Sequence, residues 1–490
     1  MNQATLRRYA RLFMVLAVLQ ALVSFVLGFV NPELHLLTVA GAANVIVLFP
    51  WFAQSYQLFS AWTPATASVI VGANLHSWGT VLRYPNDETV TRIFLLSRDV
   101  NWLIDNSWLY IAGLVMLTFS YALSSQILGS RNVRAVVQPP AQQHLQHRAV
   151  PVAVALLTVA TVSLGIFVWQ TGGLSGNSLS AKRTVIPGVS FDPAEFRTFG
   201  YLRFFNAGAV VATSILLYAW RDKVLRPRYT AALIFSIALS IAYPFYASNR
   251  SDVIGVVLAL LVVAWVINIR LPAISWLAIV SIPLIVLGYS TIARNGASAS
   301  PSAPLAAVAE GLLEPLLATQ NFADIAKTAH IAAAVPEQLE HRNGSTYAAW
   351  LVAPVPRAVW PSKPIIGTGP LIGTEIYGNV RSGVPPGLFG EAVLNFGPLG
   401  VPAIAMLFGF VIAQADRWIY SRQNDPAAVI MYAVGAFRVG EFALGQSAGE
   451  ALLNSALGLI LAYPATTFWL ARERANRRGL ATSKRTVPTL

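Results

Sequence analysis

Hydrophobic residues fall into long runs of about 20, separated by short polar or basic stretches. A helix needs a run of about that length to cross the hydrocarbon core of a bilayer. We expect each run of this kind to form a membrane-spanning helix, which gives twelve helices in all. The runs cover residues 12–30, 34–53, 62–82, 106–128, 151–171, 203–220, 229–247, 253–269, 272–292, 398–416, 427–445 and 452–470.

Basic residues in the loops predict how these helices are oriented. The N-terminus and the loop 129–150 are rich in arginine, and the loop has no acidic residue, so both are expected in the cytoplasm. An even number of spans must separate them, which requires the run at 62–82 to cross although polar residues interrupt it. Both termini are then cytoplasmic. The first run lacks a small-residue cleavage site and is expected to be a retained anchor.

This orientation divides the chain into four parts of an all-α integral membrane protein. Residues 1–292 carry nine spans with short cytoplasmic loops and an outer loop at about 172–202. Residues 293–397 form a large periplasmic loop, and residues 398–470 carry three more spans. Residues 471–490 form a basic cytoplasmic tail.

Within the large loop, six basic residues nearly balance seven acidic ones, as suits a segment that is moved across a membrane. Helical spacing of apolar residues predicts an amphipathic helix or helical hairpin within 303–335. The stretch 354–400 is instead dense in proline and glycine. The tail beyond Arg474 is expected to be disordered.

Composition supports the membrane assignment and excludes several chemistries. The chain is 55% hydrophobic and only 11% charged, whereas about a quarter of the residues of soluble proteins are charged. It has no cysteine, its six histidines form no His-x-x-x-His or Glu-x-x-His pair, and no Gly-x-x-x-x-Gly-Lys-Ser/Thr nucleotide-binding loop is present. We therefore expect neither a metal nor another cofactor. The net charge is +13, and the basic residues that produce it flank the apolar runs. Membrane topology therefore explains this charge better than nucleic-acid binding does.

Ionisable residues beside spans are candidate functional residues, because burying their charge in a membrane is costly. Arg250 lies in a Ser-Asn-Arg-Ser turn at the outer mouth of a helix, where it would bind phosphate or simply pair with Asp252. Arg357 and Lys363 lie in a stretch with four prolines. That rigid backbone would hold two cations for a polyanion, or merely carry them in solvent.

A third candidate segment, 381–397, contains Arg381, Glu391 and Asn395. If a helix begins near Gly390, Glu391 and Asn395 share one face, because they are four residues apart. The helix N-terminus would keep Glu391 ionised. The alternative is that Glu391 only caps this helix.

Arg438 and Glu441 are three residues apart inside the span 427–445, so they lie on one helix face. An ion pair that locks helices together is one interpretation, and lining a site is the other. His330 and His341 are expected to face solvent.

Several of these segments form a recognisable series. The Ser-Asn-Arg-Ser turn is followed by Gly-Ser-Thr-Tyr (344–347), Pro-x-Pro-Arg-x-x-Trp-Pro-x-Lys-Pro (354–364) and Gly-x-Pro-Pro-Gly-x-x-Gly-Glu-x-x-x-Asn-Phe-Gly-x-x-Gly (383–400). The series resembles the Wzy-type O-antigen and oligosaccharide repeat-unit polymerases. The resemblance covers residues 240–420 by motif and the whole chain by topology.

The resemblance implies a GT-C-like glycosyltransferase, inverting and metal-independent, in the bacterial inner membrane with its active site facing the periplasm. Its substrates would be glycans linked to undecaprenyl diphosphate, and its partners a chain-length regulator and a flippase. The residues at matching positions are Arg250, Arg357, Lys363, Arg381, Glu391 and Asn395. We add Arg438 as a substrate-binding candidate, and Glu391 or Asp252 as the base. Val393-Leu394 replaces the aromatic residue usual in the family.

Three other functions remain open from the sequence. An O-antigen ligase would share substrate, membrane face and large outer loop. A flippase or other transporter would place its cations along a central cavity, whereas here they cluster on one face, and no internal repeat is visible. A structural or regulatory membrane partner is the third.

Overall fold

The computed structural model describes residues 3–53, 100–127, 149–170, 202, 205–220, 226–246, 250–266 and 325–483, the last range with short gaps. Every described element is a helix. The long helices are α1 (Gln3–Gly28), α2 (His35–Ala53), α5 (Val100–Ile127), α6 (Ala149–Gln170), α8 (Asn206–Trp220), α9 (Arg226–Tyr246), α10 (Arg250–Val266), α17 (Gly400–Tyr420), α18 (Pro426–Leu444) and α19 (Ala448–Ser483). The short elements are η1 (Pro32–Leu34), α13 (Ile325–Ala334), α14 (Ser345–Ala348), η6 (Ala349–Val352), α15 (Gly369–Glu375) and α16 (Gly387–Phe396).

The long helices coincide with the apolar runs, except that the runs at 62–82 and 272–292 lie outside the described residues. Among the described helices, four are long and apolar enough to cross a membrane. They contain the segments Arg11–Gly28, Ile104–Ser124, Val150–Trp169 and Gly400–Ile419. The prediction of a helical chain with long apolar helices is thus confirmed for this part of the molecule, in keeping with a helical membrane protein.

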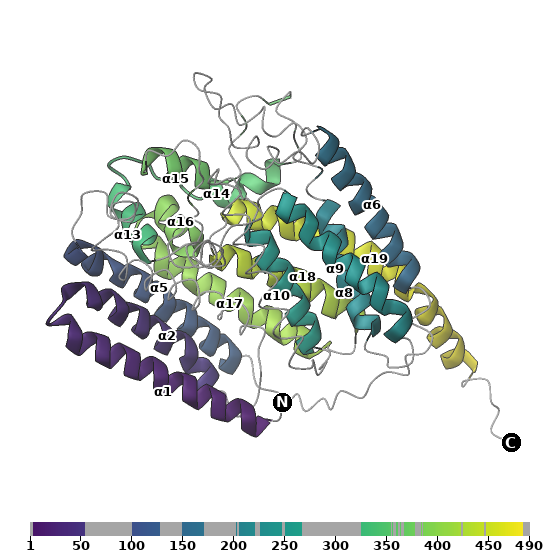
Figure 1. Ribbon diagram of the computed structural model, residues 1–490, viewed down its shortest axis with the longest axis horizontal. Helices are drawn as coiled ribbons and strands as arrows, with labels where there is room; N and C mark the ends of the chain where they lie inside the picture. Colours follow the sequence, from purple (N-terminus) through teal and green to yellow (C-terminus); the bar gives the residue numbers. More distant parts are fainter. Residues whose placement is uncertain are drawn as a thin grey trace, which may run out of the picture.

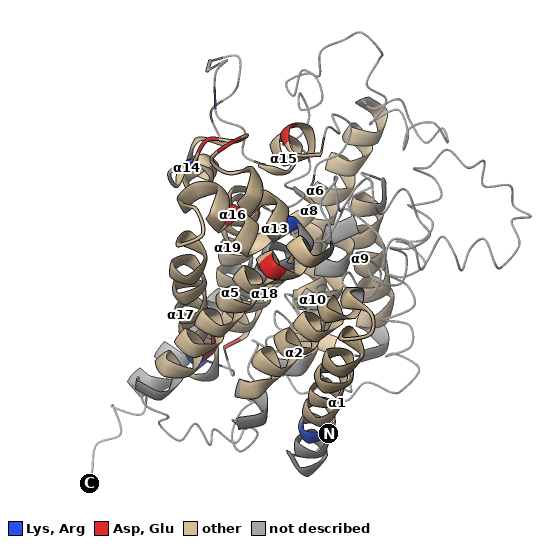
Figure 2. Cartoon of the chain, turned by 90° about the vertical axis from the view of Figure 1, so that its left-hand side faces the viewer, with Lys and Arg blue, Asp and Glu red and all other residues tan. Residues whose placement is uncertain are grey.

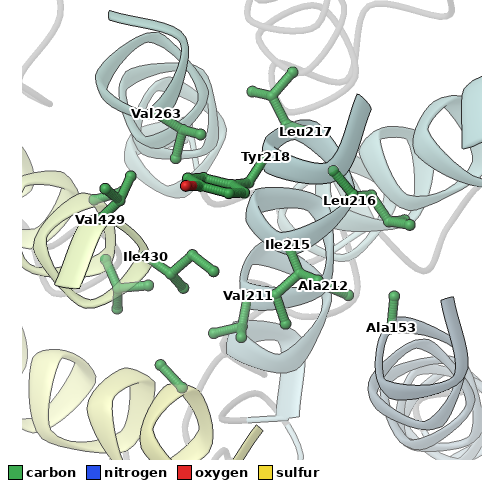
Figure 3. Packing of buried hydrophobic residues seen from close by; sticks show 14 of the residues in the cluster. Ala153, Val211, Ala212, Ile215, Leu216, Leu217, Tyr218, Val263, Val429 and Ile430 are labelled. Atoms are coloured by element: carbon green, nitrogen blue, oxygen red, sulfur yellow. The ribbon is translucent and has the colours of Figure 1, made fainter. Parts of the chain in front are cut away.

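Two groups of packed helices form the body of the molecule (Figure 1). One apolar core joins α2, α5 and α17 to the short helices α13, α15 and α16. The other joins α6, α8, α9, α10, α18 and α19. In the second core Tyr218 of α8 lies between Val263 of α10 and Val429 of α18 (Figure 3).

Helices α5 and α17 pack along most of their length and run in the same direction. Ser120 donates a hydrogen bond to the carbonyl of Met406 (2.6 Å), and Tyr121 donates one to Asp416 (2.8 Å). The two backbones come so close at Gly409 that a Cβ there would lie 2.3 Å from the carbonyl oxygen of Leu117. Only glycine fits this crossing without a shift of the backbone.

Several buried hydroxyl groups on α8 and α9 find partners within the helical bundle. Thr213, Ser214 and Ser240 each donate to the carbonyl four residues earlier. The hydroxyls of Thr213 on α8 and Ser240 on α9 also lie 3.1 Å apart. This bonding suits an apolar environment, where an unpaired polar group costs several kcal/mol.

Helix α1 shows the opposite pattern, because its apolar side chains are exposed. Leu16 and Leu19 are each 51% exposed, and Val26 is 63% exposed. A soluble protein rarely leaves a helix this apolar uncovered, whereas lipid would cover it at no cost. Red and blue residues are correspondingly sparse along the long helices in Figure 2.

The short helices α13 to α16 lie together at one end of the bundle (Figures 1 and 2). Of the stretch 303–335, the structure describes only α13 and the residues just after it. The expectation of a disordered tail beyond Arg474 is wrong as far as Ser483, because α19 continues to that residue. Alanine, arginine and leucine, all strong helix formers, make up five of the nine residues 475–483 and favour the continuation.

Candidate functional site

A buried polar cluster lies where α16 meets α14 and the start of α19. Its first member is Asn395, which is fully buried near the C-terminus of α16. Its side-chain carbonyl accepts a hydrogen bond from the Gly344 N–H (2.9 Å), and its amide donates to Thr346 Oγ1 (2.7 Å) and to the Glu391 carbonyl (2.8 Å). Asn395 therefore fastens the segment 344–346 to α16.

Backbone bonds complete this attachment. The N–H of Arg342 donates to the Leu394 carbonyl (3.0 Å), and the N–H of Asn343 donates to the Asn395 carbonyl (3.1 Å). The chain then turns through Asn343 and Gly344, whose φ angles are 47° and 82°. Asparagine and glycine are the residues that adopt this left-handed backbone most readily.

Glu391 is the second member, and it caps a different helix from the one expected. Its Oε2 accepts a hydrogen bond from the N–H of Ala448, the first residue of α19. Ser447 assists, since its hydroxyl accepts from the Glu450 N–H (3.4 Å). Pro386, with no side-chain cap, precedes α16 itself. Glu391 thus ties α16 to the N-terminus of α19.

The Glu391 carboxyl group is fully buried, and its Oε1 has no hydrogen-bond partner. Burial raises its pKa to about 7, and the negative charge of Glu450 adds to this effect. The nearby Thr346 hydroxyl and the Ala448 N–H act in the opposite direction. The expectation that a helix N-terminus keeps Glu391 fully ionised is wrong, because desolvation outweighs these contacts.

Glu450, in the first turn of α19, is only partly buried. Its Oε1 lies against Gly367, where a Cβ would come within 2.4 Å of it. The neighbouring residue, Thr368, is buried, and its hydroxyl oxygen has no hydrogen-bond partner. The two carboxyl groups of Glu391 and Glu450 are near enough for the charge of one to affect the other.

Tyr347 completes the cluster from α14. Its ring stacks on Phe396 with centroids 6.1 Å apart and planes 7° from parallel. Its buried hydroxyl oxygen has no hydrogen-bond partner. Burial, followed by the charge of Glu391, raises the pKa of this phenol, so it stays protonated and able to donate. The cluster consists of Thr346, Tyr347, Thr368, Glu391, Asn395, Ser447 and Glu450.

Of the residues expected at a site, the structure brings Glu391 and Asn395 together. Lys363 is buried, and its ammonium group donates to the carbonyls of Ala353 (2.7 Å) and Val355 (2.9 Å). Those two hydrogen bonds join Lys363 to the backbone of the same proline-rich loop. Arg357 and Arg381 lie outside the described residues.

Three other candidates are described by their backbone alone. Arg250 is the first residue of α10, and Asp252 lies in its first turn. Arg438 lies inside α18, together with Glu441. The first pair is therefore at a helix N-terminus, and the second within a helix, as the sequence predicts.

The expectation that His330 faces solvent is wrong, because α13 packs between α5 and α16. His330 is 5% exposed, its ring stacks on Trp102 with centroids 5.8 Å apart, and its Nδ1 lies 3.0 Å from the Tyr377 hydroxyl. His341 is half-buried against Gly397. Among the described residues, no group of three or more His, Asp or Glu side chains could hold a metal ion.

Sequence reasoning missed Glu450, Tyr347 and Thr368. One local signal existed for Glu450, since Ser447-Ala-Gly-Glu450 has the spacing of a helix capping box.

The comparisons with known proteins found no match: no family model, curated protein or solved structure matches the chain.

Proposed function

We propose that the protein is a membrane glycosyltransferase of the Wzy type. It would join oligosaccharide repeat units carried on undecaprenyl diphosphate at the periplasmic face of a bacterial inner membrane. The growing glycan would move from its lipid diphosphate to a hydroxyl group of an incoming lipid-linked repeat unit. A flippase would supply these units, and a chain-length regulator would be a further partner.

One observation carries this proposal more than any other. The Gly-Ser-Thr-Tyr segment at 344–347 and the Gly-Glu-x-x-x-Asn segment at 390–395 both belong to the resemblance, although over forty residues separate them. In the folded chain they are in contact, because Asn395 binds Gly344 and Thr346. Motif residues that meet at one buried polar cluster favour a shared chemical role over chance similarity.

The position of the cluster also supports the proposal. Its two glutamate residues lie on the short helix α16, which ends just before α17 begins, and at the N-terminus of α19. Neither of them lies in the middle of a long apolar helix. Parallel packing of α5 and α17 is what the predicted orientation requires, since both helices would run from the periplasm to the cytoplasm. A site at this end would face the compartment in which repeat units are joined.

The proposed chemistry needs little beyond charge and a base. A sugar hydroxyl attacks the anomeric carbon of the donor, and the bond from that carbon to the carrier diphosphate breaks. A carboxylate takes the hydroxyl proton. The candidate cations for the departing diphosphate are Arg250, Arg357, Arg381 and Arg438. Lys363 would act indirectly, by fixing the proline-rich loop that carries Arg357.

Deleting the gene in its host tests this function, with lipid-linked and surface glycans analysed by gel and mass spectrometry. We expect single repeat units to reach the surface while long chains disappear. Finished polymer retained on the carrier lipid would instead indicate a ligase, and single units trapped on the cytoplasmic side a flippase. Unchanged glycans would contradict all three functions.

A further inference from the structure

The two carboxyl groups of the cluster differ in whether a substrate could reach them. Glu391 is 0% exposed, and Oε2 is bound to the Ala448 N–H. Asn395 is also 0% exposed, and both the oxygen and the nitrogen of its side-chain amide are hydrogen-bonded. Glu450, by contrast, is only partly buried and lies at the start of the same helix that Glu391 caps. It is the accessible acid of the pair.

The surroundings of Glu450 would suit a hydroxyl-bearing ligand. Gly367 provides no side chain at the point where the Glu450 carboxyl group lies, so the backbone approaches closely. Next to Gly367, the buried hydroxyl of Thr368 has no hydrogen-bond partner, and Thr368 is 4% exposed. Oε1 of Glu391 and the hydroxyl of Tyr347 are likewise buried without partners. Buried polar atoms without a protein partner are rare in folded proteins and are explained by an ordered water or ion, by strain or by a functional role.

We propose that Glu450 is the base that takes the proton of the attacking sugar hydroxyl, and that Glu391 is a positioning residue that holds the first turn of α19. This inference rests on the proposed glycosyltransferase function. In the reaction the O–H bond of the acceptor breaks and its oxygen bonds to the anomeric carbon. The bond from that carbon to the diphosphate breaks, and the diphosphate leaves with the electron pair. Glu450 holds the proton until it is released to water.

The two roles predict different responses to substitution. Glu450→Gln keeps size and removes basicity, so turnover is expected to fall about 100-fold or more, with KM nearly unchanged. Glu391→Gln keeps a carbonyl oxygen that accepts from the Ala448 N–H and should retain most activity. Glu391→Leu removes that acceptor, so turnover and thermal stability should both fall. Glu340→Gln, at an exposed acid of the outer loop, is the matched control.

The test uses the full-length protein in liposomes and, as probe, the lipid-diphosphate-linked single repeat units extracted from the deletion strain. Turnover, KM and thermal unfolding are measured for the wild type and each variant. Activity of Glu450→Gln near the wild-type level would overturn the inference, and so would a loss in folded Glu391→Gln as deep as in Glu450→Gln. Failure of the wild type to extend these units would instead contradict the proposed function itself.

Discussion

At the scale of single residues, Glu391 shows how burial changes a carboxyl group. Its pKa of about 7 in the folded chain lies above the ordinary value of 4.5, because burial disfavours the charged form. The folded state therefore binds a proton more tightly than the unfolded state does. Its contribution to stability is complete below about pH 4.5 and is lost as the pH rises through about 7.

We predict that the thermal unfolding temperature of the wild type falls by a few degrees between pH 6 and pH 8. Glu391→Gln, which is neutral at every pH, should remove most of this change. Differential scanning fluorimetry in detergent across that range checks the result, with Glu340→Gln as a control that keeps the wild-type profile. An equally steep fall in Glu391→Gln would mean that another group titrates.

The sequence predicts part of this residue-scale picture. Glu391 and Asn395 share a helix face because they are four residues apart, and local spacing alone reveals that. The contact between Glu391 and Ala448 joins residues 57 positions apart, and no local pattern encodes it. The contact of Glu450 with Gly367 also joins residues far apart in the sequence, so no local pattern predicts it. Desolvation depends on such tertiary neighbours, so the direction of the Glu391 pKa shift was not foreseeable either.

At the scale of helices, the close crossing of α5 and α17 predicts that a side chain at Gly409 destabilises the protein. A Cβ at Gly409 would lie 2.3 Å from the Leu117 carbonyl oxygen, whereas a Cβ at Gly165 on α6 meets nothing within 4 Å. Gly409→Ala should cost about 1–3 kcal/mol, because the backbones must separate. Gly165→Ala should be neutral or slightly stabilising, since alanine favours a helix. Unfolding in detergent compares the two, and equal effects would contradict the crossing.

Asp416 joins three helices at the other end of α17. Its Oδ2 accepts from the Tyr121 hydroxyl of α5 (2.8 Å), and its Oδ1 accepts from the Tyr432 hydroxyl of α18 (2.7 Å). Asp416 is 3% exposed. The sequence places it beside Arg417 at the end of a span, which gives no sign that it is buried.

We predict that Tyr121→Phe and Tyr432→Phe each lower stability by about 1–3 kcal/mol, because each removes a buried hydrogen bond to a carboxyl oxygen. The double substitution should cost less than the sum, since both bonds share one acceptor group. Chemical or thermal unfolding measures these effects. Tyr463→Phe, at a tyrosine that is 62% exposed, is the matched control and should change nothing. Additive losses would show that the two bonds act independently.

At the scale of the whole molecule, the hydrophobic runs predict where helices lie but not how they are ordered in space. Runs of about 20 apolar residues are a local signal, and the described helices follow them closely. The division into two packed groups depends on which helix faces meet, and almost uniformly apolar helices do not specify their faces. Topology therefore needs a direct test.

Because the chain has no cysteine, single cysteines can report the orientation. Ser345 on α14 and Ser421 at the end of α17 are both exposed, so Ser345→Cys and Ser421→Cys form a matched pair. We predict that a membrane-impermeant maleimide labels Ser345→Cys in cells whose outer membrane has been opened. Ser421→Cys should react only after the inner membrane is dissolved. The reverse pattern would place the carboxylate cluster in the cytoplasm and contradict the proposed orientation.

The most direct test of the central claim is to supply purified wild-type protein in liposomes with lipid-diphosphate-linked repeat units from the deletion strain. Mass spectrometry then follows the products. The proposed function predicts chains that grow by whole repeat units, with one carrier lipid diphosphate released for each bond formed. Units that remain single while the protein is folded and correctly oriented would contradict the assignment as a polymerase.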